Sequence, residues 1–223
     1  MRRTDVTVLA ALLALASAGA HADGWPDVPM PDGAQGEWVA RDMVNNGLPM
    51  RASRYQVPMT PAQLVEYLRR AWNGMVVVDE IGEQTIVGHA QDDHYVTVDI
   101  RREGTGSVAQ VGIVRMSAQR PSTAPGKDFP RPSGSRVVND IEYIDEPGRT
   151  LSVEAPLSPY QSDTYYRQRL PGDGWKLDVA GSRPCVAMSV QCSSSYSRGK
   201  ETMVLTFTRM AEGTSIVANQ TRR

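Results

Sequence analysis

The chain is poor in the residues that enzymes use most often for acid–base, nucleophilic or metal chemistry. Its 223 residues include only three histidines and two cysteines. None of the motifs G-x-S-x-G, H-E-x-x-H or C-x-x-C occurs, and no phosphate-binding loop is found. Lys and Arg number 24 against 25 Asp and Glu, without a basic tract, so nothing supports nucleic-acid binding. These absences point to no cofactor and to no recognisable catalytic chemistry.

Only one long apolar run is present, and it lies at the amino terminus. Arg2 and Arg3 precede the run at residues 6–18, and Ala20-His21-Ala22 follows with the small-x-small pattern of a cleavage site. This predicts a signal peptide over residues 1–22, with an uncleaved anchor as the alternative. Cleavage leaves 24 − 2 = 22 basic and 25 − 1 = 24 acidic residues, a net charge of −2. We therefore expect a periplasmic or secreted protein that is soluble and has no membrane span.

The two cysteines of an exported chain most often form a disulfide. Cys185 and Cys192 are seven positions apart, and such odd spacing places them on opposite faces of a flat strand. A bond between them therefore requires a turn or a bulge within residues 185–192. A redox-active pair is disfavoured because the spacing is not C-x-x-C.

A short motif occurs twice, 98 positions apart, at residues 58–63 and 156–161. In both copies a hydroxyl residue (Thr60 or Ser158) precedes a proline, and a glutamine follows. Such residues predict an N-cap, a proline at the first helical position and a capping box closed by glutamine at N3. Tyr and Arg recur at matching offsets after each copy. The chain is therefore predicted to contain two related modules in tandem.

The predicted fold class is α+β, with each module an antiparallel sheet and one amphipathic helix packed on a face, in a ββαβββ-like order. In the first module the strands are expected at 39–43, 51–57, 75–79, 85–90, 95–101 and 108–116. In the second they are expected at 137–141, 149–155, 175–179, 186–190, 203–209 and 215–219. The apolar face of the first helix is expected to be Leu64, Tyr67, Leu68, Ala71 and Trp72, and that of the second to be Tyr165, Tyr166 and Leu170.

Composition divides the mature chain into four parts. Residues 23–36 are rich in Pro, Gly and Asp and predict a flexible leader. Residues 37–117 form the first module. Residues 118–135 have the Pro- and Ser-rich composition of a linker. Residues 136–223 form the second module.

The densest group of chemically versatile side chains is His89, Asp92, Asp93 and His94. Two imidazoles and a carboxylate could bind a divalent metal. The structural interpretation, which we favour, is a turn at Asp92-Asp93 between two strands, so no metal site is assigned. The serine-rich residues 193–197 lack a nearby base and predict a flexible polar hairpin loop rather than a nucleophile.

The four tryptophans divide into two pairs. Trp72 and Trp175 lie at or beside a predicted helix face and are expected in the core. Trp25 and Trp38 flank the predicted leader and are candidate partner contacts.

The favoured function is that of a non-catalytic exported protein that binds another envelope or secreted protein or takes part in envelope assembly. The alternative is a secreted hydrolase or metal-dependent enzyme that uses His89, Asp92, Asp93 and His94. Within the binding class, an inhibitor could place the loop 185–192 into an enzyme cleft. The sequence leaves the partner and the oligomeric state open.

Overall fold

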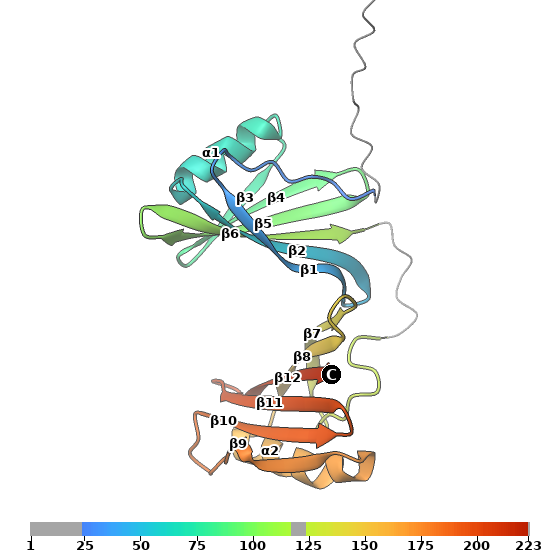
Figure 1. Ribbon diagram of the computed structural model, residues 1–223. Helices are drawn as coiled ribbons and strands as arrows, with labels where there is room; N and C mark the ends of the chain where they lie inside the picture. The colour runs from blue at the N-terminus through green and yellow to red at the C-terminus, as the bar shows by residue number, and fades with distance from the viewer. Residues whose placement is uncertain (1–23, 117–123, 223) are drawn as a thin grey trace, which may run out of the picture.

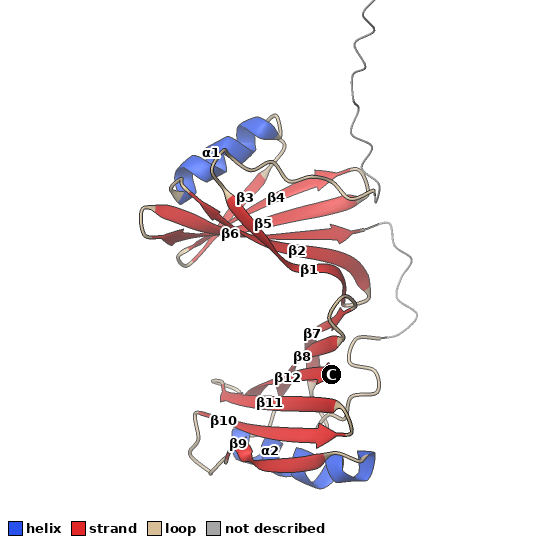
Figure 2. Ribbon diagram, viewed as in Figure 1, coloured by secondary structure: helices blue, strands red, loops and turns tan. Residues whose placement is uncertain are grey.

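The structure is a computed structural model that describes residues 24–116 and 124–222 (Figures 1 and 2). The predicted signal peptide and residues 118–123 of the predicted linker lie outside the described residues. The first group of elements is β1 (Gln35–Asn45), β2 (Leu48–Val57), α1 (Pro61–Ala71), β3 (Val77–Ile81), β4 (Gln84–Gln91), β5 (His94–Glu103) and β6 (Gly106–Arg115). The second group is β7 (Arg136–Tyr143), β8 (Gly148–Ala155), α2 (Pro159–Arg169), η1 (Leu170–Asp173), β9 (Lys176–Arg183), β10 (Gln191–Arg198), β11 (Glu201–Arg209) and β12 (Thr214–Arg222).

All of these strands belong to one 12-stranded antiparallel sheet in the order β3-β4-β5-β6-β2-β1-β7-β8-β12-β11-β10-β9. We call β1–β6 with α1 the first half, and β7–β12 with α2 and η1 the second half. The α+β class is as predicted, and four strands follow each helix, the number expected from the sequence and one more than the ββαβββ label counts. Within the described residues, neither helix has the length and apolar character that a membrane crossing needs.

The expectation of one sheet for each module is not met, because β1 pairs with β7. The pairing runs from Met43↔Tyr143 to Asn45↔Ile141. Asn46, in the left-handed region at φ 49°, extends it by donating its N–H to the Asp140 carbonyl at 2.8 Å and accepting the Asp140 N–H on its side chain at 2.9 Å. The first strand of each half would otherwise present unpaired N–H and C=O groups. The pairing satisfies the part of each edge that it covers and joins the halves.

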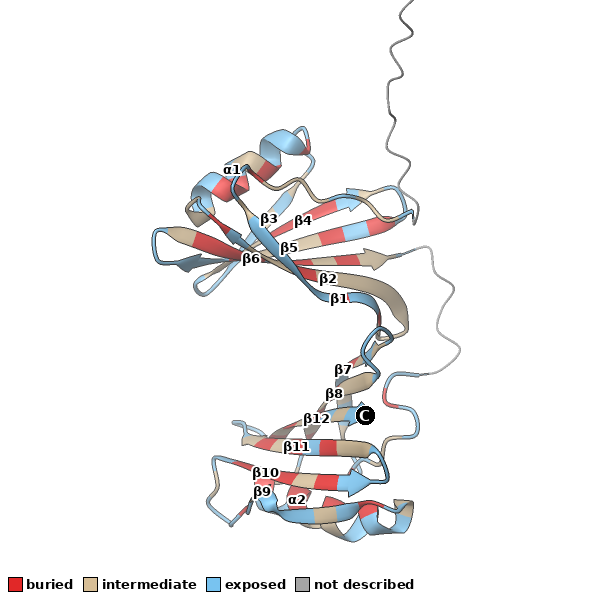
Figure 3. Cartoon of the chain, viewed as in Figure 1, coloured by how far each residue is buried: buried red, intermediate tan, exposed pale blue. Residues whose placement is uncertain are grey.

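The two halves have the same strand order when each is followed outward from this junction. In the first half the order is β1-β2-β6-β5-β4-β3, and in the second it is β7-β8-β12-β11-β10-β9. Figure 1 shows the halves at the two ends of the molecule, each with its own helix. Buried and exposed segments alternate along many of the strands, as expected where a helix covers only one face (Figure 3).

Both helices begin with the predicted capping box. The Thr60 hydroxyl accepts the Gln63 N–H at 3.4 Å, and Gln63 accepts the Thr60 N–H at 3.0 Å. In the second half the equivalent distances between Ser158 and Gln161 are 3.2 and 3.0 Å. The repeated motif therefore serves as a pair of helix starts.

Helix α1 packs on the first half through apolar side chains. Leu64, Val65 and Leu68 are buried, and Trp72 at the C-cap is buried beside them. They contact a core built from β2, β4, β5 and β6, whose buried members are Val57, Val87, Val96, Val98, Ile100, Ala109, Val111 and Ile113. Burial of this apolar face is the main source of stability for so short a helix.

Helix α2 packs through the predicted Tyr165 and Tyr166 and also through polar residues that were not predicted. The buried residues on it are Pro159, Ser162, Asp163 and Tyr166, whereas Tyr165 is only partly buried. Leu170 is buried, but it begins η1 and is not part of α2. The prediction omitted Ser162 and Asp163 because it counted apolar residues only. The strand beneath α2 supplies hydrogen-bonding partners that allow polar residues to be buried.

The segment that precedes each half packs against the helix of that half. The Tyr67 hydroxyl donates to the Met30 carbonyl at 2.9 Å, and the Tyr165 hydroxyl donates to the Arg131 carbonyl at 2.8 Å. Trp25, Val28, Met30 and Ala34 pack against the first core, and Phe129 packs against the second. The described parts of the predicted leader and linker are thus held by equivalent tyrosines.

Two predicted elements in the second half are wrong. Residues 186–190, predicted as a strand, lie in the loop between β9 and β10. Residues 193–197, predicted as a flexible loop, lie in strand β10. In β10 every second residue is buried, namely Cys192, Ser194 and Tyr196. This alternation of buried and exposed side chains is typical of a strand, even though most residues of β10 are small and polar.

Candidate functional site

His89 serves in packing. It lies in β4, is buried, and stacks on Trp72 with ring centroids 4.4 Å apart and planes inclined by 12°. Its Nδ1 atom is 2.6 Å from the Met75 carbonyl oxygen, so this nitrogen carries the proton and donates. One face of the imidazole therefore contacts Trp72 at the end of α1, and one ring nitrogen binds the chain that follows this helix.

His94 is buried at the start of β5. Its Nε2 atom accepts a hydrogen bond from Arg115 Nε at 3.2 Å, and its Nδ1 atom is 2.7 Å from Asp93 Oδ1. The Trp25 ring lies 5.0 Å from the imidazole, between centroids. Both ring nitrogens are thus occupied by neighbouring side chains. Asp92 adopts φ 51° in the turn before β5, as the turn interpretation requires.

The four residues of the sequence-predicted cluster therefore do not form one site: Asp93 and His94 pair with each other, whereas His89 packs on Trp72. Over the described ranges, no group of three or more His, Cys, Asp or Glu side chains is arranged to hold a metal ion. His89 lies against α1, whereas His94 lies against β6 and the segment before β1. The arrangement can stabilise the first core.

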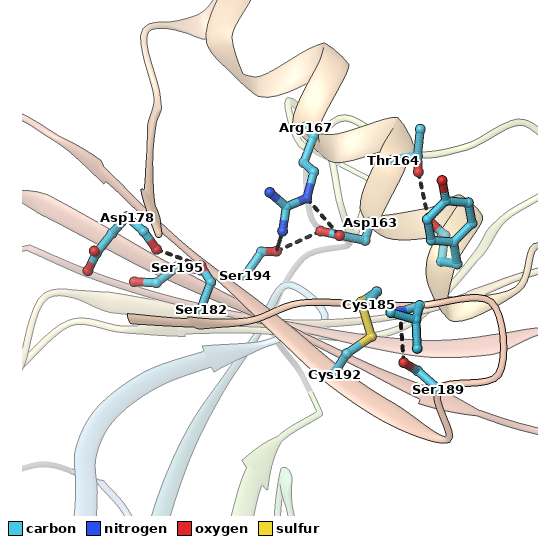
Figure 4. Close-up of polar contacts among 12 residues, drawn as sticks. Asp163, Thr164, Arg167, Asp178, Ser182, Cys185, Ser189, Cys192, Ser194 and Ser195 are labelled. Carbon is cyan, nitrogen blue, oxygen red and sulfur yellow. Dashed lines mark hydrogen bonds and ion pairs between the residues drawn. A yellow bond between two sulfur atoms is a disulfide. The ribbon is translucent and has the colours of Figure 1, made fainter. Parts of the chain in front are cut away.

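Ser194, in β10, is fully buried and lies beside charged side chains of α2 (Figure 4). It donates to Asp163 Oδ1 at 2.6 Å. Arg167 binds both residues, with Nε 2.7 Å from Asp163 Oδ2 and a terminal nitrogen 3.1 Å from the Ser194 hydroxyl. Tyr196 lies in the same core, where burial raises the pKa of its hydroxyl to about 12. We call Asp163, Arg167 and Ser194 the buried triad. It fastens α2 to the sheet.

The two tryptophans proposed for partner contact have different surroundings. Trp25 is half-buried, and the guanidinium groups of Arg51 and Arg115 lie 4.9 and 4.8 Å from its ring. Trp38, in β1, has 46% of its surface exposed. Arg41 lies 5.5 Å from the Trp38 ring, a geometry that supports a cation–π contact.

Trp38 belongs to an irregular part of β1. The register of β1 against β2 shifts between Trp38 and Ala40, so that Val39 is the extra residue of a β-bulge and is 61% exposed. The backbone N–H of Arg41 donates to Asp145 Oδ2 at 2.8 Å, and this bond lowers the pKa of the Asp145 carboxyl. We call Trp38, Val39 and Arg41 the junction surface. The bulge turns these side chains toward solvent beside the point where the halves join.

The junction surface borders a shallow hollow. Val39, Tyr143 and Asp145 are among the residues that line it, and its volume is about 330 Å³. Trp and Arg are among the residues most enriched at the energetic centres of protein interfaces. The sequence indicated Trp38, but the bulge and the position of Arg41 could not be read from it.

A second exposed apolar group lies on the loop between β9 and β10. Cys185 and Cys192 form the predicted disulfide, with Cα atoms 5.1 Å apart. Val186, Met188 and Val190 all point into solvent from the loop that this bond closes. Alternating apolar residues between two cysteines were the signal for this loop. The same alternation predicts a strand at residues 186–190, whereas the structure has a loop there.

A hollow with a volume of about 650 Å³ lies in the second half. Arg149, Arg169 and Arg198 line it. Each of these guanidinium groups already binds a carboxylate, on Asp140, Asp173 and Glu201 respectively. The hollow therefore offers little uncompensated positive charge to an anionic ligand.

No family model and no curated protein matches this sequence. Two solved structures are similar over most of the chain. The apo structure of immunity protein TplEi of the T6SS from Pseudomonas aeruginosa is 12% identical, with 87% of this chain and 83% of that chain covered and a TM-score of 0.29. A chain of the crystallised Tle4–Tli4 complex is also 12% identical, with 87% and 82% covered and a TM-score of 0.26. Similarity at this level assigns neither a family nor a function.

Proposed function

We propose that this chain is an exported, non-catalytic protein that binds another envelope or secreted protein. The observation that carries the proposal is the junction surface, where Trp38, Val39 and Arg41 are exposed on a bulged strand inside a continuous sheet. Strand β2 pairs with this part of β1, and the Arg41 N–H donates to Asp145, so these side chains are presented on a supported backbone. A preorganised aromatic and arginine contact loses little conformational entropy on binding.

The rival hypothesis of a hydrolase or metal-dependent enzyme has no such support. His89 stacks on Trp72, and His94 binds Asp93 and Arg115. A general base must reach a substrate proton. Buried imidazoles whose nitrogens bind neighbouring groups are better suited to holding the first core together.

We further propose that the two halves are related modules that arose by duplication. The identical strand order from the junction outward, the two capping boxes and the equivalent roles of Tyr67 and Tyr165 support this. The tyrosine contacts favour counting residues 24–36 with the first module and residues 124–135 with the second. Two modules joined through β1 and β7 could contact a partner at two points, which raises avidity.

The proposed export rests on the signal-peptide pattern of residues 1–22 and on the Cys185–Cys192 disulfide. Disulfides form and persist in oxidising compartments. Periplasmic and extracellular locations both fit this pattern.

The test is affinity purification of the tagged mature chain from its native envelope, followed by titration of the recovered and purified protein. Trp38→Ala should weaken binding by more than about tenfold, the effect expected of an interface centre. Tyr160→Ala is the matched control, because Tyr160 is an exposed aromatic residue on α2. Equal binding by wild type and Trp38→Ala would remove the junction surface from the proposal.

The rival enzyme hypothesis is tested in the same preparation with His94→Gln. This change keeps a hydrogen-bonding side chain at the buried position. We expect cellular activity to be retained at normal protein levels. Loss of activity in a folded, exported variant that still binds the partner would favour the enzyme.

A further inference from the structure

The loop between β9 and β10 is longer than the fold requires. It comprises the seven residues 184–190. In the first half, β3 and β4 occupy the equivalent outermost positions of the sheet and are joined by the two-residue turn Gly82-Glu83. The same connection can therefore be closed by two residues. The additional length in the second half has no evident role in forming the sheet.

The longer loop is held in one conformation by a disulfide and by hydrogen bonds within the loop. Cys185 and Cys192 close it. The Ser189 hydroxyl accepts the Val186 N–H at 2.9 Å (Figure 4). The Ser189 N–H donates to the Val186 carbonyl at 3.0 Å. These contacts fold the loop into a tight turn around Ala187 and Met188.

Arg209, at the end of β11, supports the loop from the sheet. Its guanidinium group donates to the carbonyl of Ala187 at 2.9 Å and to that of Ser189 at 3.2 Å. Its backbone N–H donates to the Val190 carbonyl at 2.7 Å. The loop is thus ordered before any partner arrives, which is the condition under which a binding loop loses least entropy.

The side chains that this loop presents are apolar and exposed. Met188 has 85% of its surface exposed, Val190 68% and Val186 61%. Isolated exposed apolar residues are common, but three of them on one rigid projection form a patch of the kind that marks interaction sites. Methionine in particular adapts its shape to apolar pockets.

The charge around the loop indicates the chemistry of its partner. Residues 184–192 contain no acidic side chain, and the exposed Arg183 lies immediately before them. Arg209 adds a second positive charge beside the loop. The mature chain as a whole carries a net charge of −2. A partner would therefore meet an apolar tip with a positive base on a slightly negative protein.

We propose that this loop inserts Met188, flanked by Val186 and Val190, into an apolar cleft with an acidic rim on a partner protein. The proposal rests on the proposed protein-binding function and adds a contact separate from the junction surface. A lipid surface is the less favoured occupant. The loop has no aromatic anchor and lacks the cluster of four to eight basic residues typical of binding to anionic lipid.

The experiment uses the full mature chain with a photo-crosslinking amino acid, p-benzoylphenylalanine, at position 188 or, as a control, at position 75. Met75 is also an exposed methionine, but it lies in the first half. The protein cross-linked in the native envelope is identified, purified and titrated against wild type, Met188→Asp and Met75→Asp. Vesicles of phosphatidylethanolamine and phosphatidylglycerol are tested in parallel by co-sedimentation. Thermal melting confirms that each variant is folded.

We expect cross-linking of a defined protein from position 188 and not from position 75. Met188→Asp should weaken binding to that protein by more than about tenfold, whereas Met75→Asp should stay within about twofold of wild type. Cys185→Ser/Cys192→Ser should bind more weakly than wild type, because the loop is no longer preordered.

Three results would overturn the loop proposal. In the first, Met188→Asp binds the partner as tightly as wild type does. In the second, Met188→Asp and Met75→Asp weaken binding equally. In the third, wild type co-sediments with the vesicles and Met188→Asp does not. If a partner requires Trp38 but not Met188, the loop proposal fails and the protein-binding function stands. If neither position cross-links a protein and the envelope yields no partner, both proposals fail.

Discussion

Helices α1 and α2 begin in the same way and pack in different ways. Both have a capping box and a proline at the first helical position. At matching positions, 98 residues apart, α1 buries Leu64, Val65 and Leu68, whereas α2 buries Ser162, Asp163 and Tyr166. The local signals that start a helix are thus separable from the side chains that attach it to a sheet. Related positions can use either apolar burial or a satisfied polar network.

An Asp–Arg pair at matching strand positions also has different surroundings in the two halves. Asp42 and Arg51 in the first half match Asp140 and Arg149 in the second. Arg149 binds both carboxylate oxygens of the buried Asp140, at 2.8 and 2.7 Å, and the Gly126 N–H donates to Asp140 at 2.6 Å. Asp42 is exposed, and Arg51 lies over the Trp25 ring. Similar residue pairs thus have different partners, set by the segment that covers each half.

The largest expected effect comes from removing the apolar attachment of α1. Leu68→Ala should lower the free energy of unfolding by about 3–4 kcal/mol, because it deletes a fully buried side chain and leaves a cavity. Urea unfolding followed by tryptophan fluorescence measures this. Exposed Glu66→Ala on the same helix is the control. A loss below about 1 kcal/mol would mean that apolar packing does not hold α1.

Breaking the buried triad tests the polar attachment of α2. Asp163→Ala should cost about 2–3 kcal/mol, because Arg167 and Ser194 lose their acceptor while Arg167 remains partly solvated. The double variant Asp163→Leu/Ser194→Val, which imitates the apolar packing of α1, should be more stable than Asp163→Ala. If the double variant is the less stable of the two, α2 depends on the triad itself.

Acid unfolding should distinguish Asp140 from its counterpart Asp42. Burial alone would raise the pKa of Asp140, but the bonds from Arg149 and the Gly126 N–H outweigh it and hold this pKa below the usual 3.8. A lowered folded-state pKa stabilises the fold above the unfolded-state pKa, and this stabilisation is lost as the pH falls through the folded-state value.

Asp140→Asn should therefore cost about 1–2 kcal/mol at pH 7 and show a shallower loss of stability below about pH 4 than wild type. Asp42→Asn, at the matching exposed position, should change stability by less than about 0.5 kcal/mol at either pH. Urea titrations at pH 7 and at steps down to pH 2.5 measure both. If wild type and Asp140→Asn lose stability equally steeply below about pH 4, the lowered pKa of Asp140 does not contribute to acid unfolding.

The smallest effect is expected at Tyr166. Its hydroxyl is buried and has no hydrogen-bond partner in the described structure, and burial raises its pKa. Tyr166→Phe should therefore change the free energy of unfolding by less than about 0.5 kcal/mol or stabilise the protein slightly. Thermal melting of the two proteins provides the comparison. A loss above about 1 kcal/mol would reveal a partner for this hydroxyl, such as a bound water.

The junction surface and the disulfide-closed loop show how far sequence reasoning reached toward a binding site. The exposed Trp38 was indicated by its place beside the Pro- and Gly-rich leader. The disulfide Cys185–Cys192 was predicted, but residues 186–190 of this loop were predicted as a strand, because Val186, Met188 and Val190 alternate as strand residues do. Alternating apolar residues indicate that the two faces of an extended segment differ in polarity. They do not indicate whether a neighbouring strand is available for pairing.

Local chemistry was enough to determine where the helices begin, most of the strands and the Cys185–Cys192 pairing. Caps, turns and short-range periodicity depend on residues that are close along the chain. Only the tertiary structure decided that β1 would pair with β7, that Ser194 would lie in a buried strand beneath Asp163, and that His89 and His94 would serve in packing. Each of these depends on contacts between segments distant in sequence. A buried polar side chain or an edge strand needs a hydrogen-bonding partner, and folding brings that partner from a distant part of the chain. The residue itself therefore does not show whether such a partner exists.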